Sequence, residues 1–337
     1  MSYLVLAAAL TLITLAGLAP STVASLIVSG QHEAWTMPRT GWGDPDLQGV
    51  WSFSADTPLN RPAEFEGRAL LTDEEVAQRV EATAQLRFNR DNRLSATKAG
   101  PSGLEGAGGN DNRFWTDPKR TSRQTSLVVD PPDGRVPPLT PEANRWYTEI
   151  DRRRAGTPMD AQTPGGFVQD LGPRGLFTRC ILGFNSGPPM APLSYNENVQ
   201  IFQTPDHVAL LNEMVHSVRV VPLDGHPQLS EKIRQWVGDS RGRWDGDTLV
   251  VTTTNFTDQV FDFGRMRPRG SGLILVEQFT RTAADTVLCQ FTITDPVWHT
   301  SPWTAQLPME PSSGPLYEYA CHEGNHSMPN ILAGALE

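Results

Sequence analysis

The sequence predicts a mainly β protein, because alternation of apolar and polar residues with period two dominates the chain from Asn198 onward. Extended segments follow one another there, and short turns separate them. Segments of this kind form half-buried antiparallel strands. Successive antiparallel strands form a meander, so we expect a lipocalin-like barrel or a barrel-like sandwich. We expect an N-terminal arm containing two helices to precede this barrel.

The arm begins with one predicted strand and a first helix. Alternation in Asp46–Phe53 favours the strand, which follows a Pro/Gly-rich lead. Thr72 and Glu75 have the spacing of a capping box, in which each side chain bonds to the backbone of the other residue. We therefore expect a helix from this box to about Phe88.

A second helix is expected later in the arm. Pro141 follows Thr140 and suits the first turn, where its missing N–H costs nothing, and the helix should end near Arg154. Residues 95–138, which lie before it, are rich in Gly, Pro, Asn and Asp. This composition is typical of long surface connections.

The strands of the barrel are expected in pairs that form hairpins. The dipeptide Asp245-Gly246 between two of them suits a type I′ turn, which needs positive φ. The expected hairpins cover Val199–Thr204 with Val208–Val221, Gln235–Trp244 with Thr248–Phe256, and Leu273–Arg281 with Thr286–Thr294.

The first residues indicate export. Leu4–Ala19 is almost wholly apolar, and small residues follow it, as in a secretory signal peptide. We therefore expect a signal peptide over 1–25, the arm over 26–175 and the barrel domain over 176–337. The mature protein would be periplasmic or secreted, with no stable membrane insertion after cleavage. The alternative is an uncleaved anchor, because the only positive charge before the apolar run is the amino terminus.

Charge and cysteine content limit the function further. The net charge of the 337-residue chain is −10, and no block of basic residues stands out, which argues against nucleic acid as a partner. Three cysteines allow one disulfide. Cys289 lies on the apolar face of its strand and is expected to be the buried free thiol. We expect Cys180 and Cys321 to be joined.

Three long motifs resemble a family of exported bacterial proteins that occurs in sphingomonads and acidobacteria. They are Thr125–Arg135, Gly238–Val251 (GDSRGRWDGDTLVV) and Tyr317–Asn325 (YEYACHEGN). The resemblance covers most of the chain after residue 40. It implies an exported protein and brings no activity with it. Relatives tend to have Tyr at the position of His326.

Two short catalytic motifs occur in contexts that disfavour their usual chemistry. His322, Glu323 and His326 have the H-E-x-x-H spacing of zinc hydrolases, which requires both histidines on one helical face. Gly324-Asn325 between them disfavours that helix. The string Gly238–Gly242 matches G-x-S-x-G, but a strand rather than a helix is expected after it.

Titratable residues occur among apolar ones on the expected strands. On Val208–Val221, Glu213 and Arg219 share one face, which predicts an opposite-charge pair, and His216 lies on the other face. On Leu273–Arg281, Glu277 and Arg281 share a face and are expected to form a salt bridge. The alternative to structural pairing is a pocket lined by apolar and titratable groups.

We therefore expect an exported enzyme that performs acid/base chemistry, as a lyase, isomerase or hydrolase, on a small hydrophobic or aromatic molecule in the barrel. Acid/base roles fall to His216 and His322. The expected proton-sharing and charge-stabilising residues are Glu213, Asp239, Glu323 and Arg219, and the expected substrate-binding residues are Trp244, Glu277, Arg281, Trp303 and Tyr319. The sequence contains no motif for an organic cofactor, and no metal is expected.

Two alternatives remain open. One is a non-catalytic periplasmic carrier of a hydrophobic ligand, whose polar groups only orient that ligand. The second is a metal-dependent hydrolase that uses His322 and His326.

Overall fold

The structure is a computed structural model that describes residues 35–96, 118–157, 161, 163–164, 175–193, 195–257 and 272–334. The expected signal peptide over 1–25 lies outside the described residues. Residues 36–337 belong to one compact unit.

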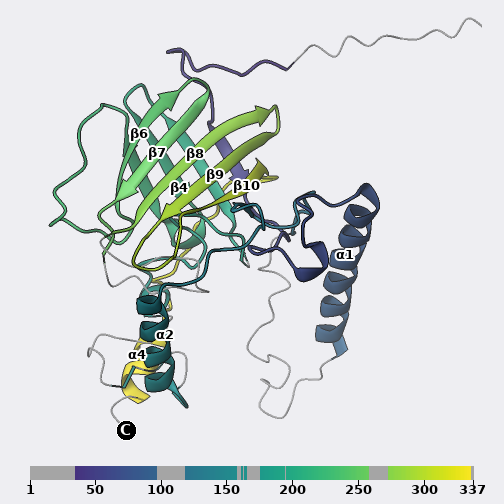
Figure 1. Cartoon of the computed structure of the whole chain (residues 1–337), viewed down its shortest axis with the longest axis vertical. Helices are drawn as coiled ribbons and strands as arrows, with labels where there is room; N and C mark the ends of the chain where they lie inside the picture. The colour runs from purple at the N-terminus through teal and green to yellow at the C-terminus, as the bar shows by residue number, and fades with distance from the viewer. Residues whose placement is uncertain are drawn as a thin grey trace, which may run out of the picture. The chain divides into compact units, whose positions relative to one another are not determined.

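The strands form one antiparallel sheet that curves into a nearly closed barrel (Figure 1), as predicted. The sheet is 10-stranded, with the order β5-β4-β3-β1-β10-β9-β8-β7-β6 and β2 paired to β10. The strands are β1 (Gly49–Ser52), β2 (Val128–Asp130), β3 (Asn198–Gln203), β4 (His207–Asn212), β5 (Val218–Pro222), β6 (Asp239–Asp245), β7 (Thr248–Thr254), β8 (Ile274–Ala283), β9 (Thr286–Thr294) and β10 (Trp303–Pro311).

The barrel closes where β5 lies against β6, although no ladder of hydrogen bonds joins these two strands. Gly242 makes this close approach possible. A Cβ atom at this position would lie 2.6 Å from Leu223 Cδ2 and 2.8 Å from Val221 Cγ1, closer than real Cβ contacts. The absence of a side chain therefore lets the two edge strands meet.

The hairpins expected over Gln235–Phe256 and Leu273–Thr294 are present as β6–β7 and β8–β9. The expectation of one strand over Val208–Val221 is wrong. The chain turns back between β4 and β5, which pair with each other. The extra strand β10 lies between β9 and β1 and was not among the expected strands.

Part of the expected arm belongs to the barrel. β1 pairs with both β3 and β10, so it completes the sheet between them. The expectation that residues 95–138 form only surface connections is wrong for their C-terminal part, because Leu127 and Val128 are buried and β2 pairs with β10. Residues 97–117 lie outside the described residues.

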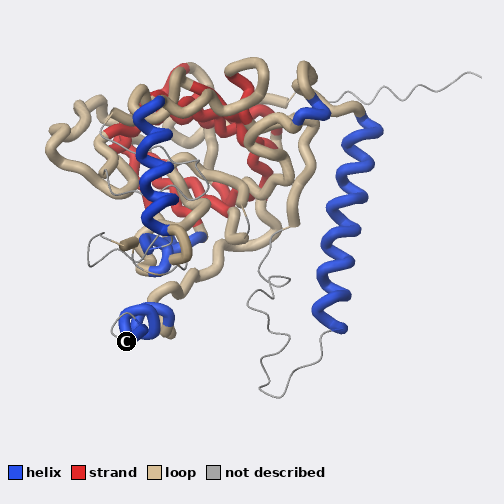
Figure 2. Tube along the Cα trace, turned by 60° about the horizontal axis from the view of Figure 1, so that its bottom comes forward, coloured by secondary structure: helices blue, strands red, loops and turns tan. Residues whose placement is uncertain are grey.

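Both predicted helices form, and Figure 2 shows the helices outside the strands. α1 (Asp73–Ala96) starts at the expected capping box and extends beyond the expected end at Phe88. The Thr72 amide donates to Glu75 Oε2 (2.8 Å), and the Glu75 amide donates to Thr72 Oγ1 (3.2 Å). Among the described residues, the other helices are α2 (Pro141–Arg154), α3 (Gly175–Thr178), α4 (Ser327–Gly334) and the 3₁₀ turns η1 (Ala63–Phe65) and η3 (Met214–His216).

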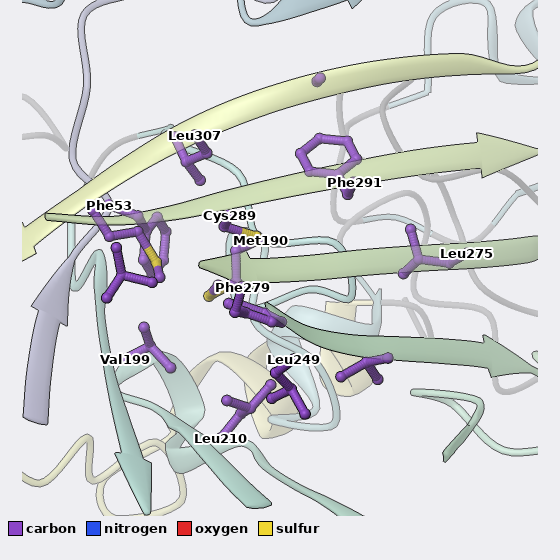
Figure 3. Close-up of a cluster of buried hydrophobic side chains, with 14 of the residues drawn as sticks. Phe53, Met190, Val199, Leu210, Leu249, Leu275, Phe279, Cys289, Phe291 and Leu307 are labelled. Carbon is purple, nitrogen blue, oxygen red and sulfur yellow. The ribbon is translucent and has the colours of Figure 1, made fainter. Parts of the chain in front are cut away.

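Inward-facing side chains fill the barrel. Phe279, Leu249 and Leu275 meet Cys289 and Leu307 in one buried cluster (Figure 3). Cys289 is the buried free thiol, as expected, and its burial raises its pKa well above the ordinary value. The space enclosed by these strands is therefore a packed core. None of the described helices is both long enough and apolar enough to span a bilayer.

Candidate functional site

A cavity of about 1190 Å³ lies at one end of the barrel, and we call it the end cavity. Its lining includes Ser52 at the end of β1, Asn198 at the start of β3 and Glu213 directly after β4. Neighbouring strands are antiparallel, so these termini meet at the same end of the sheet. The outer wall is the tail between Ser312 and Asn325, which follows β10.

The tail is fixed to the rest of the protein by a disulfide and by hydrogen bonds. The predicted disulfide between Cys180 and Cys321 is present. Asn325 Nδ2 donates to the Thr178 carbonyl oxygen (2.9 Å), next to this disulfide. His216 Nδ1 lies 3.1 Å from the Tyr319 carbonyl oxygen. These contacts fix the tail at Tyr319, Cys321 and Asn325.

Glu213 is the most buried carboxylate of the end cavity, with 5% of its surface exposed. Asn198 Nδ2 donates to its Oε2 (2.6 Å), and the Tyr317 amide lies 3.4 Å from its Oε1. The backbone amide of Glu213 also donates to the Asn198 carbonyl oxygen (3.0 Å). The carboxylate is thus held in one orientation, as a proton-transfer group requires.

The backbone after Glu213 is strained. Val215 and His216 have φ values of 50° and 42°, in the left-handed region that residues with a Cβ avoid. Such conformations persist where surrounding contacts hold them, and they cluster at functional sites. Here the strained turn carries Glu213 into the wall of the cavity and brings His216 to the tail.

Two phenols meet inside the end cavity. Tyr319 is hydrogen-bonded to Tyr195, and both residues line the cavity. Burial, together with the neighbouring Tyr195, raises the pKa of Tyr319 to about 12. Tyr319 therefore keeps its proton at neutral pH, and this phenol pair can polarise a carbonyl or hydroxyl group of a ligand.

The end cavity is acidic and partly aromatic. The carboxylates of Glu213, Glu318 and Glu323 line it, whereas the lining guanidinium of Arg120 is paired with Glu310. Phe177 and the tyrosines add flat apolar surface. Such a lining disfavours anionic ligands and suits a neutral or cationic molecule with an aromatic or apolar body.

Several of the residues proposed from the sequence meet at the end cavity. Glu213, Glu323 and Tyr319 line it, and His216 contacts its outer wall. His322 is exposed and is not part of the lining. The end cavity therefore brings together some of the predicted site residues, from segments about 100 residues apart in the sequence.

Other candidates lie elsewhere. Arg219 and Glu277 form a buried pair inside the barrel, with Arg219 Nη2 donating to Glu277 Oε1 (3.0 Å). The expected pairs of Arg219 with Glu213 and of Glu277 with Arg281 are therefore wrong, because Arg219 and Glu277 bond to each other inside the barrel.

The remaining candidates serve local contacts. Asp239 accepts from Arg241 Nη1 (2.7 Å) and from the Leu229 amide (2.8 Å). Arg281 lies over the Trp51 ring, 5.4 Å from the ring centroid. Trp303 is buried in the core, and Trp244 packs against that core.

The two short motifs adopt other structures. His322 and His326 lie in a turn before α4, with Gly324 at φ 66°, so they do not share a helical face. Ser240 lies inside β6 and contacts Thr253 Oγ1 at 2.9 Å, and β7 follows without a helix. Among the described residues, no group of three or more His, Cys, Asp or Glu side chains is arranged to hold a metal ion.

Sequence reasoning missed the residues that make Glu213 and Tyr319 into a site. Asn198 and Tyr195 come from the segment that enters β3, and neither belongs to a motif. Asn198 lies opposite the end of β4 in the hairpin register, so knowledge of the turn after Asn212 would have placed it next to Glu213.

The fold and the end cavity define an antiparallel β-barrel protein with a packed core and a cavity between the barrel end and a disulfide-linked tail. Comparison with protein-family models, with curated proteins and with solved structures finds no match.

Proposed function

We propose that the protein is an exported enzyme that transfers protons on a small hydrophobic or aromatic molecule bound in the end cavity, as a lyase, isomerase or hydrolase. The observation that carries this proposal is the buried, oriented carboxylate of Glu213 in the same cavity as the Tyr195–Tyr319 phenol pair. A carboxylate can accept a proton from the ligand while a phenol stabilises the negative charge that develops.

The cavity chemistry supports a neutral or cationic substrate. Its volume of about 1190 Å³ exceeds the usual range for small-molecule sites, so the ligand would fill only part of it. Phe177 and Tyr195 offer surfaces on which an aromatic ring can stack. In this role Glu213 acts as the base, and Glu323 and His216 form part of the surroundings.

The proposed export has support from covalent structure. A disulfide such as Cys180–Cys321 persists in oxidising compartments, which include the bacterial periplasm and the extracellular space. The apolar Leu4–Ala19 segment and the resemblance to exported bacterial proteins agree with this location.

The test begins with native mass spectrometry of the purified protein, which identifies molecules retained in the end cavity. Each molecule found is then incubated with the protein in D₂O, and deuterium at its carbon atoms is measured. We expect the wild type to catalyse this exchange and Glu213→Gln to slow it by a factor of about 10²–10⁴, while the molecule still binds.

Glu231→Gln is the control, because Glu231 is exposed and lies outside the lining of the end cavity. Exchange should proceed at the wild-type rate in this variant. A retained ligand that the wild type neither exchanges nor hydrolyses, and that binds equally to all three proteins, would indicate the alternative of a non-catalytic carrier.

A further inference from the structure

A second pocket lies between the start of α2 and the loop that joins β9 to β10. It has a volume of about 320 Å³ and is lined by Thr140, at the start of α2, and by the loop between β9 and β10. The Thr140 amide donates to the Trp298 carbonyl oxygen (2.9 Å), and the Thr300 amide donates to that of Pro138 (3.0 Å). Backbone bonds therefore hold the two walls together, so the pocket is preformed.

Two buried side chains of this pocket have polar atoms without a partner. Asp295 is 2% exposed, and its Oδ1 accepts from the amides of Val297 (3.1 Å) and Trp298 (3.3 Å). Its Oδ2, like Nδ1 of the 5% exposed His299, has no hydrogen-bond partner among the described residues. Buried polar atoms are nearly always paired, so two exceptions in one small pocket need an explanation.

The rest of the described lining offers no cationic side chain to these atoms. Among the described residues it consists of hydroxyl side chains and of Pro296 and Pro302, and it contains neither Lys nor Arg. A buried carboxylate without a counter-ion is unfavourable, because burial removes its hydration without replacing it. The part of the pocket that the structure describes thus has acceptors and an apolar wall but no positive charge.

We propose that this pocket binds a compact organic cation, such as a small primary amine, whose ammonium group donates to Asp295 and His299 while its carbon chain lies along the prolines. Its volume is at the lower end of the range for small-molecule sites, which limits the ligand to a short chain. The proposal is independent of the function proposed for the end cavity.

The protonation states of both groups fit this role. Burial raises the pKa of Asp295 to about 6 and lowers the pKa of His299 below its ordinary value of 6.5. Above neutrality the carboxylate is therefore ionised and the imidazole is neutral. Both groups then present acceptor atoms to an ammonium ion.

The experiment titrates the full chain with n-butylammonium at a pH of about 8 and follows binding by ligand-observed NMR. 1-Butanol and butyrate serve as size-matched neutral and anionic probes. We expect saturable binding of n-butylammonium, roughly 10-fold or more tighter than that of 1-butanol, because a charged hydrogen bond contributes more than a neutral one. Equal affinity for n-butylammonium and 1-butanol would overturn the proposal.

Variants then locate the bound probe. Asp295→Asn keeps an oxygen for the Val297 and Trp298 amides but removes the charge, and should weaken n-butylammonium binding by roughly 10-fold or more. Asp285→Asn removes the same charge from an exposed turn and should bind like the wild type. Wild-type affinity for n-butylammonium in the folded Asp295→Asn variant would overturn the proposal. If that variant does not fold, the affinities of the wild type for n-butylammonium and 1-butanol decide it.

Discussion

Asp295 and His299 show how burial of single residues makes stability depend on pH. Asp295 has a folded-state pKa of about 6, above its ordinary value of 3.8, so the folded protein binds its proton more tightly than the unfolded chain does. Its stabilising contribution is complete below 3.8 and is lost as the pH rises through 6. The pKa of His299 is lowered by burial, so this residue acts in the opposite sense: the folded protein loses stability as the pH falls below 6.5.

These directions give a prediction for Asp295→Asn. At a pH of about 8 the variant should be more stable than the wild type by roughly 2 kcal/mol, because no charge is left to bury. At a pH of about 3 the wild-type carboxyl is protonated in both the folded and the unfolded chain, so the two proteins should be nearly equally stable. Urea unfolding at both pH values measures this difference. A stability difference that does not change with pH would contradict the assignment.

At the scale of an element, the turn between β4 and β5 is the most unusual feature of the sheet. It contains neither Gly nor Pro, yet Val215 and His216 both adopt positive φ. The contacts of Glu213 with Asn198 and of His216 with Tyr319 hold this turn in place. The turn is therefore more strained than a glycine-containing hairpin, and its strain positions the candidate base of the end cavity.

A pair of substitutions at His216 measures the strain. His216→Gly and His216→Ala both remove the contact with the Tyr319 carbonyl, and they differ only in the Cβ atom at φ 42°. We expect the Gly variant to be more stable by about 1 kcal/mol in urea unfolding, because the left-handed conformation costs a residue with a Cβ about 1–2 kcal/mol. The same two substitutions at the exposed strand residue Val220 should favour Ala. A more stable Ala variant at His216 would show that the turn is not strained.

The same turn explains why some elements could be predicted and others not. Both helices start at local signals, the Thr72–Glu75 box and the Thr140 cap, which act within a few residues. The turn after Asn212 depends on contacts with the distant tail, so the residue types within the turn do not predict it. Strand β10 alternates buried and half-buried residues, but Pro308 argues against a strand in the sequence. The proline is tolerated because it falls between the residues of β10 that pair with β2 and those that pair with β1.

At the scale of the whole molecule, the composition of the candidate site was only partly predictable. Sequence reasoning chose Glu213, Glu323 and Tyr319 by residue type and correctly joined Cys180 to Cys321. It could not tell that the barrel would be filled by side chains, which moves the cavity from the interior to one end. Which residues face one another across a barrel depends on its closure, and alternation within one strand does not encode this.

The buried pair of Arg219 and Glu277 is the clearest product of that closure, because it joins β5 to β8 through the packed core. Arg219→Met alone should leave an unpaired buried carboxylate and lower the free energy of unfolding by about 3–5 kcal/mol. Glu277→Leu alone should cost a similar amount, for the corresponding reason. The double variant should be close to the wild type or more stable, because apolar residues then fill the same space.

Urea unfolding of the wild type, the single variants and the double variant gives the coupling energy between the two positions. The exposed pair of Glu149 and Arg152 on α2 is the control, and its coupling should be much smaller, because solvent screens the two charges. If the costs of the two core substitutions simply add, Arg219 and Glu277 do not depend on each other. The barrel would then not close in the way that places both side chains in its interior.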